Sequence, residues 1–130
     1  MRGIEPVEYR VAGGGFKACL QRRTPPVREA IDPAVAAVFG VEIGDLGAAT
    51  RGSPRAAFAR QVAMYLANVV CGLSLSEVGA LFGRDRTTVA HACHVVEDGR
   101  DDPELDRRLD YLEGAVVSLI EALFTRVRNP

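Results

Sequence analysis

The chain has 130 residues, 48% of them hydrophobic, and a formal net charge of −1 at pH 7. This length allows one modest core, and no apolar run approaches the roughly 20 residues that a membrane span needs, so we expect no membrane partner. The first residues lack the apolar core of a secretion signal, and three widely spaced cysteines fit reduced thiols better than a disulfide framework. These features predict a cytoplasmic protein.

The charges are unevenly distributed along the chain. Residues 1–60 hold nine Lys or Arg and six Asp or Glu, whereas residues 61–130 hold seven and eleven. Eight acids lie between Glu97 and Glu113. The chain lacks the strong basic excess of most proteins that grip nucleic-acid phosphates. We interpret the acidic segment as a solvated face, because no nucleophile beside it indicates catalysis, and expect any phosphate contact to be weak and local.

Residues 1–26 are predicted to form a flexible N-terminal arm, because they include three consecutive glycines and end at the stop signal Pro25-Pro26. Apolar residues then recur at helical spacing from Val27 to Phe39, which predicts a helix. Asp32-Pro33 has the form of a cap followed by a first-turn proline, so the regular part begins either at Val27 or at Asp32. Residues 41–46 are expected to form a short turn or a single helical turn.

A loop over residues 48–54 and a long helix from Arg55 to Val70 are predicted next, the helix from its apolar stripe. Ser74 stands three residues before Glu77, the spacing of a capping box in which each side chain satisfies a backbone N–H of the other residue. A short helix is therefore expected to open at Ser74 and to end at Gly83.

Asp85 is the natural cap of a further helix, predicted from Arg86 to Glu97, and Asp102-Pro103 opens the last one. No strand pattern is present. The predicted fold class is all-α, a small helical bundle over residues 27–127. The last helix carries a leucine-rich stripe that either closes the core, which we favour together with a monomer, or forms a homodimer. The stripe is Leu105, Leu109, Leu112, Val116, Leu119 and Leu123.

Two predicted helices separated by a glycine turn, Ser74–Phe82 and Arg86–Glu97, indicate a helix-turn-helix. At 3.6 residues per turn, the second helix turns one side to the core, made of Val89, Ala92, Cys93 and Val96. Its outward side suits a DNA groove, because arginine pairs with guanine, threonine offers a hydroxyl and a methyl group, and alanine leaves room for close approach. This side comprises Arg86, Thr87, Ala90, His91 and His94, with Thr88 at its margin.

Three segments in order carry a family likeness: RQVAMYLA at 60–67, SLSEVG at 74–79 and FGRDRTTVAHA at 82–92. Together they resemble the C-terminal DNA-binding domain (domain IV) of DnaA, the bacterial chromosomal replication initiator, with nearly the family's spacing. The resemblance extends over residues 30 to about 123. It implies an all-helical bundle, with a helix-turn-helix related to that of the Trp repressor, that binds short initiator boxes in duplex DNA.

The resemblance also implies which residues contact DNA. Asp85, Thr87 and Thr88 match positions that contact bases or adjacent phosphates, and His91 and the pair Arg60-Gln61 match positions near the backbone. An arginine that enters the minor groove falls at Gly52 here, so Arg51 or Arg55 is expected to replace it. The complete predicted DNA-binding set is Arg51, Arg55, Arg60, Gln61, Asn68, Ser74, Ser76, Arg84, Asp85, Arg86, Thr87, Thr88 and His91.

The chain departs from the family pattern at three further places. The family usually has His where Arg86 stands, which predicts a preference shifted toward a base pair that arginine can read. It commonly has two glycines before the Arg-Asp pair, and here only Gly83 is present, so the turn is expected to be tighter or the next helix slightly re-aimed. A lysine that grips phosphate corresponds to Asn68, which predicts weaker affinity.

We expect no metal, no cofactor and no enzyme activity. Cys93 falls on the core side of its helix and the two histidines on the outer side, so they do not converge on a tetrahedral site. Nothing resembles a Gly-rich phosphate loop followed by Lys-Ser/Thr, since residues 13–17 lack its spacing. The chain is therefore expected to be a free-standing DNA-binding domain without the ATPase region of the initiator.

Two functions are open at this point. The first is sequence-specific binding of double-stranded DNA in the nucleoid, regulating replication initiation, transcription or both. The second is a protein-interaction module that modulates the replication initiator with little DNA reading of its own. The retained Asp85, Thr87 and Thr88 and the added Arg86 favour the first, whereas Asn68 and the acidic balance favour the second.

Overall fold

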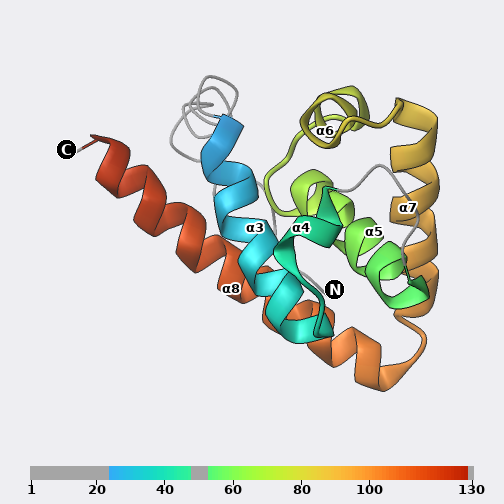
Figure 1. Ribbon diagram of the computed structural model, residues 1–130. Helices are drawn as coiled ribbons and strands as arrows, with labels where there is room; N and C mark the ends of the chain where they lie inside the picture. Colours follow the sequence, from blue (N-terminus) through green and yellow to red (C-terminus); the bar gives the residue numbers. More distant parts are fainter. Residues whose placement is uncertain (1–23, 48–52, 129–130) are drawn as a thin grey trace.

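Helices make up most of the described structure, which is a computed structural model covering residues 24–47 and 53–128 (Figure 1). These residues contain no strand, which confirms the predicted all-α bundle with a helix-turn-helix. Residues 1–23 and Arg51 lie outside the described part, and none of its helices is long and apolar enough to cross a membrane. In chain order the helices are α3 (Thr24–Phe39), α4 (Ile43–Leu46), α5 (Pro54–Val69), α6 (Leu75–Phe82), α7 (Arg86–Gly99) and α8 (Pro103–Arg128).

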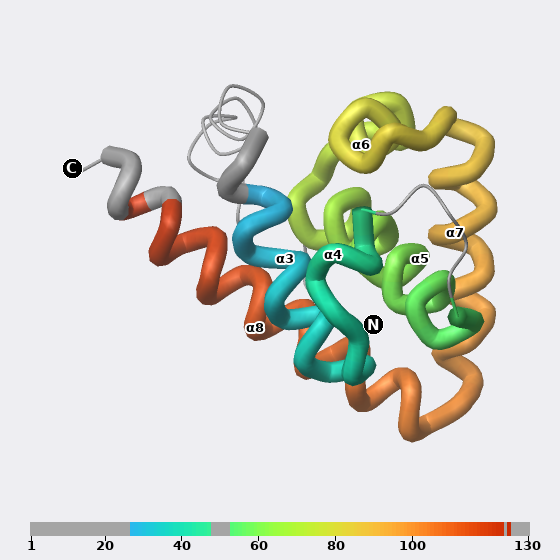
Figure 2. Tube along the Cα trace, in the orientation of Figure 1, coloured from blue at the N-terminus to red at the C-terminus, as the bar shows by residue number. Residues whose placement is uncertain are grey.

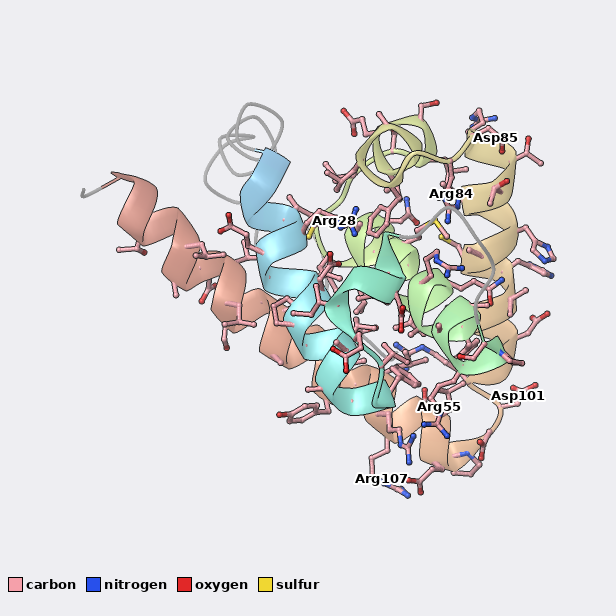
Figure 3. All side chains as sticks on the ribbon, viewed as in Figure 1. Arg28, Arg55, Arg84, Asp85, Asp101 and Arg107 are labelled. Carbon is pink, nitrogen blue, oxygen red and sulfur yellow. The ribbon has the colours of Figure 1, made fainter. Side chains whose placement is uncertain are left out.

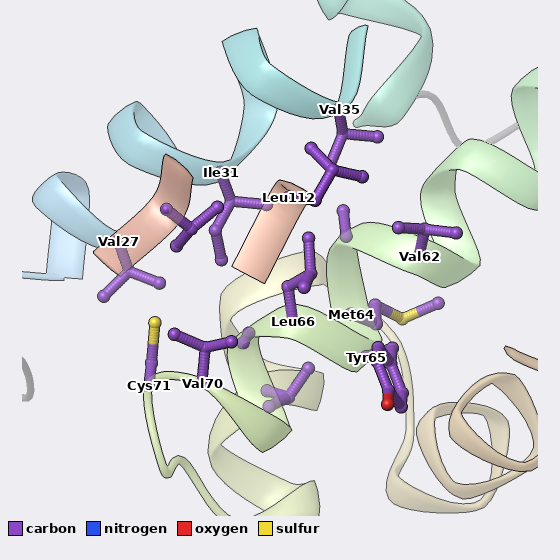
Figure 4. Close-up of a cluster of buried hydrophobic side chains, with 14 of the residues drawn as sticks. Val27, Ile31, Val35, Val62, Met64, Tyr65, Leu66, Val70, Cys71 and Leu112 are labelled. Atoms are coloured by element: carbon purple, nitrogen blue, oxygen red, sulfur yellow. The ribbon is translucent and has the colours of Figure 1, made fainter. Parts of the chain in front are cut away.

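Helix α5 is the centre of the bundle and contacts α3, α4, α6 and α7 (Figures 1 and 2). It begins one residue before the predicted start, where the Ser53 hydroxyl accepts a hydrogen bond from the Ala56 N–H at 3.0 Å. Its residues 62–67 are all buried. Leu66 packs in a cluster with Ile31 of α3 and Leu112 of α8 (Figure 4). Residues 62–67 are therefore hydrophobic around the whole circumference of α5, because other helices surround this segment.

The start of α3 differs from the prediction. The helix begins at Thr24, so Pro25 and Pro26 lie in its first turn, where a proline removes only N–H groups that have no helical partner. It also continues through Pro33, so Asp32 is not its start, and Val27, the other predicted start, lies within the helix. A proline inside a helix costs about 3 kcal/mol locally. Because α3 packs along both α5 and α8, the burial of its apolar side outweighs that cost.

Asp32 is a buried member of an ion pair rather than a helix cap. Arg28 Nε donates to its carboxylate at 2.8 Å, and only 7% of the residue is exposed. Burial raises the pKa of Asp32, and the hydrogen bond and charge of Arg28 oppose that rise. Arg28 also donates to the Leu81 carbonyl at 3.2 Å and lies 4.0 Å from the centre of the Phe82 ring. This one side chain therefore links α3 to the last turn of α6.

Helix α8 runs along α3 and closes the core (Figure 2). Leu109, Leu112 and Val116 of the predicted stripe are buried, as the core-closing interpretation requires. Leu119 is 40% exposed, whereas Val117 and Ile120 are buried. The buried side of α8 is thus turned slightly away from the leucine stripe, toward the side that α3 covers. The oligomeric state, for which a monomer is favoured over a homodimer, stays a prediction.

Candidate nucleic-acid interface

The turn between α6 and α7 is held by interactions at both ends of α6. At the start, the Ser74 N–H donates to Glu77 Oε1 at 2.7 Å and the Glu77 N–H donates to Ser74 Oγ at 3.1 Å, which confirms the capping box. At the end, Gly83 has a left-handed φ of 69° and the Arg84 N–H donates to the Gly79 carbonyl at 2.8 Å. A single glycine is therefore sufficient to close this turn.

Gly79 permits the close packing of α6 against the turn that follows it. A Cβ atom at this position would lie 2.4 Å from the Arg84 carbonyl oxygen, which is backbone and cannot rotate away. Any side chain would therefore push the turn, and α7 with it, away from α6. The glycine fixes the distance between the two helices of the motif.

Asp85 caps the start of α7, as predicted. Its Oδ1 atom accepts a hydrogen bond from the Thr88 N–H at 2.7 Å, in a side chain that is exposed to solvent. That bond holds the pKa of Asp85 below its usual value. The carboxylate therefore satisfies the free N–H groups at this helix end and fixes where the following side chains begin.

The outward side of α7 begins directly after this cap. Arg86, Thr87 and Thr88 are exposed in the first turn, and Ala90, His91 and His94 continue the exposed side. Val89, Ala92 and Val96 are buried on the opposite side. The two sides are those that the sequence predicts. An exposed polar turn at the start of the second helix is what direct contact with base edges requires.

Two predicted contact residues on α5 direct their polar groups into the protein. Arg60 is only 8% exposed and donates to the Asp45 carbonyl at 3.1 Å. Burial lowers its pKa and the nearby Arg84 charge lowers it further, while Asp45 opposes the shift. Asn68 donates to the Leu73 carbonyl at 2.8 Å, and its Oδ1 lies 4.0 Å from Cys93 Sγ. Arg60 therefore links α5 to α4, and Asn68 links α5 to the segment just before α6 and to α7.

Comparison with known proteins identifies the family. The family model for the bacterial DnaA protein helix-turn-helix matches residues 28–96, more than half of the chain. The chain belongs to this family.

Three relatives illustrate how much of the DnaA family the chain represents. The chromosomal replication initiator protein DnaA of Symbiobacterium thermophilum is 34% identical over 131 residues, covering 95% of this chain and 25% of the relative. DnaA 2 of Chlamydia pneumoniae is 38% identical over 90 residues, covering 68% and 20%. DnaA 1 of Protochlamydia amoebophila is 46% identical over 69 residues, covering 53% and 15%. The chain spans a quarter or less of these relatives.

The remaining predicted contact residues of this DnaA-family helix-turn-helix lie in different places. Ser74 and Ser76 are exposed at the start of α6, and Gln61 is half-buried on α5. Arg55 is exposed at the start of α5, far from Arg84 in Figure 3, and lines an open hollow with residues of the α3–α4 connection and α4. Their roles toward DNA stay predictions, and Arg51 lies outside the described residues.

Sequence reasoning missed a polar cluster at the other end of α7. Arg100 is 6% exposed. Its guanidinium donates to the Tyr65 hydroxyl at 3.1 Å, to Asp106 at 2.6 Å and to Asp110 at 3.1 Å, and it pairs with the buried Glu113. The Tyr65 hydroxyl in turn donates to Glu97 at 3.0 Å. We call these six residues the Arg100 cluster: Tyr65, Glu97, Arg100, Asp106, Asp110 and Glu113.

The Arg100 cluster corrects the interpretation of the acidic segment as a wholly solvated face. Burial acts to lower the pKa of Arg100, but the hydrogen bonds that it donates to Asp106 and Tyr65 and the Glu113 charge outweigh it, so the pKa is raised. Burial raises the pKa of Tyr65 to about 12. The spacing of Asp106, Asp110 and Glu113 along one side of α8 is the sequence signal for the cluster, because steps of four and three residues share a helix face.

The described residues hold no group of three or more His, Cys, Asp or Glu side chains placed to bind a metal ion. Cys93 is half-buried and its Sγ faces Asn68, whereas His91 and His94 are exposed. Burial raises the pKa of both Cys71 and Cys93, which disfavours the thiolate form that metals bind.

Proposed function

We propose that this protein binds double-stranded DNA in a sequence-specific manner, with the start of α7 in the major groove. The observation that carries the proposal is the exposed run of Arg86, Thr87, Ala90 and His91 directly after the Asp85 cap, on a helix held in place by Gly79 and Gly83. Arg86 is the residue we assign to a guanine, because its fork of N–H donors matches the two acceptors of that base.

The relatives are chromosomal replication initiator proteins, which supports a role at initiator-like boxes. In this proposal the protein acts in the nucleoid and regulates replication initiation, transcription or both. The proposal assigns backbone contacts to Arg84 at the turn, to Ser74 and Ser76 at the start of α6, and to Gln61 on α5. The buried Arg60 and the internal hydrogen bond of Asn68 leave fewer cations for phosphate, so moderate affinity is expected.

The burial of Arg60 and the internal hydrogen bond of Asn68 also favour a second candidate function, a module that contacts the replication initiator and reads little DNA. If Arg60 and Asn68 serve only the fold, the helix-turn-helix retains its shape, but these two α5 positions supply no cation to DNA phosphates. The two functions differ in whether purified protein alone prefers one duplex sequence over others.

The deciding experiment is selection of binding sites from random duplexes at stated salt. The proposal expects a defined motif, and Arg86→Ala should weaken discrimination at one base pair by about 1–3 kcal/mol. Arg107→Ala on α8 removes the same kind of exposed side chain from another part of the surface and should leave the motif unchanged. Absence of any enriched motif would reject sequence-specific binding and favour the interaction module.

A further inference from the structure

The outward side of α7 does not stay neutral or basic to its end. At 3.6 residues per turn, Glu97 and Asp98 fall on the same side of the helix as Arg86, Ala90 and His94. Both acids are exposed. Along this side, arginine and threonine come first, then alanine and two histidines, and then two carboxylates.

The two ends of this side act on DNA separately. Asp98 is twelve residues after Arg86, which corresponds to about 18 Å along the helix axis. Charges are screened over roughly 8 Å at physiological salt. The carboxylates therefore do not cancel the charge of Arg86, and each end experiences only the phosphates nearest to it.

Apart from His94, whose Nε2 lies 3.4 Å from Asp98 Oδ2, the basic side chains described near Asp98 pair with other acids. Asp101, Asp102 and Glu104 are exposed just beyond them, and Figure 3 shows Asp101 at the opposite end of α7 from Asp85. Arg100 is held inside its cluster of carboxylates, and Arg107 and Arg108 pair with Glu104. The negative end of the helix dipole adds to the same field.

We propose that Asp98, supported by Glu97, limits how much of α7 approaches DNA and thereby determines specificity. This inference rests on the proposed function. The acids repel the phosphate backbone, so the helix enters the groove by its first turns and its last turns tilt away. Repulsion of any backbone weakens non-specific binding most, because that mode depends on phosphate contacts alone. A selected site retains its base contacts at Arg86 and Thr87.

A purely local role for Asp98 accounts for less. Asp98 Oδ2 lies 3.4 Å from His94 Nε2, but the two side chains are 71% and 77% exposed. Ion pairs this exposed contribute little to helix stability. If Asp98 did no more than pair with His94, neutralising Asp98 would leave the non-specific affinity of the protein for DNA unchanged.

The test compares the whole chain with its Asp98→Asn variant on the selected duplex and on a duplex of random sequence, between 50 and 200 mM salt. We expect about a two- to fivefold gain in affinity for the random duplex, a smaller gain for the selected one, and a steeper salt dependence. Glu121→Gln makes the same change in net charge in the C-terminal part of α8, which runs away from α7 (Figure 1), and should alter neither affinity. The Asp98→Asn effect should persist in a His94→Gln background.

Three outcomes would overturn the inference: an unchanged specificity ratio, an equal effect of Glu121→Gln, or loss of the effect when His94 is replaced. Failure of the proposed function is seen separately, as a wild-type protein that prefers no duplex. In that case the random duplex still tests the repulsion, since Asp98→Asn should bind it more tightly.

Discussion

The two ends of α7 use polar residues in opposite ways. At the first end, Arg86, Thr87 and His91 are exposed, and the Asp85 cap before them fixes the backbone. At the second end, the Arg100 guanidinium is enclosed by its own carboxylates and by the Tyr65 hydroxyl. The first end leaves its polar side chains exposed to solvent, and the second satisfies them within the protein.

This difference separates function from stability along one helix. The Arg100 cluster joins α5, the end of α7 and α8, so its loss should affect the whole bundle. The exposed side chains at the start of α7 contact little of the protein, so they can change with small effects on folding and large effects on binding. Substitutions at the two ends test this division.

The largest expected effect is that of Arg100→Met, which keeps a long apolar side chain and removes the charge. Glu113 would then be a buried carboxylate without its cation, so the free energy of unfolding should fall by about 3–5 kcal/mol. Urea unfolding followed by circular dichroism measures this. Arg107→Met removes an exposed partner of Glu104 and should cost less than about 1 kcal/mol. Similar values for the two variants would show that the Arg100 cluster is not the stabilising end.

A smaller loss is expected for Gly79→Ala, at the junction of the two regions. Its Cβ would meet the Arg84 carbonyl, so we expect a loss of about 1–3 kcal/mol from overpacking, together with weaker binding of the selected duplex. Gly114→Ala is the matched control, because its Cβ meets nothing within 4 Å. Alanine there should stabilise α8 by roughly 0.5–1 kcal/mol. A neutral Gly79→Ala would contradict the close packing of α6 on the turn.

The smallest effect concerns pH and Asp85. Its folded-state pKa lies below the unfolded value because the Thr88 N–H bonds the carboxylate. The stability that this provides is present above the unfolded value, near 4, and is lost as the pH falls through the lower folded value. Asn caps a helix about as well and does not titrate, so Asp85→Asn should lose less stability between pH 6 and pH 2.5 than the wild type. Urea midpoints at both values, with Asp101→Asn as an exposed control, measure the difference; equal losses in Asp85→Asn and the wild type would contradict the assignment.

The sequence predicted those features that depend on near neighbours. The capping box, the Gly83 turn and the Asp85 cap each lie within a few residues, and their chemistry is the same in any fold. The buried and exposed sides of α7 follow from helical spacing in the same way. Family resemblance then connected that local pattern to DNA.

The features that the sequence did not reveal depend on distant partners. Asp32-Pro33 has the local form of a helix start, yet packing against α5 and α8 carries α3 through it. In the sequence, the acids after Glu97 look solvated. The fold buries Arg100 among them and brings Tyr65, 35 residues before Arg100, into contact with it. Arg60 and Asn68 were expected at the surface, and only the fold shows that their polar groups donate hydrogen bonds to backbone carbonyls of the protein.

Helix α5 has one further consequence, for the opening motions of the protein. Because its residues 62–67 have no solvent-facing side, no neighbour can leave without exposing part of it. Backbone amides in such a segment exchange with solvent only through opening that approaches global unfolding. Hydrogen exchange should therefore be slowest in α5, with α7 protected to the extent that it remains attached. The recognition helix would then be displaced together with the fold rather than by swinging free of it.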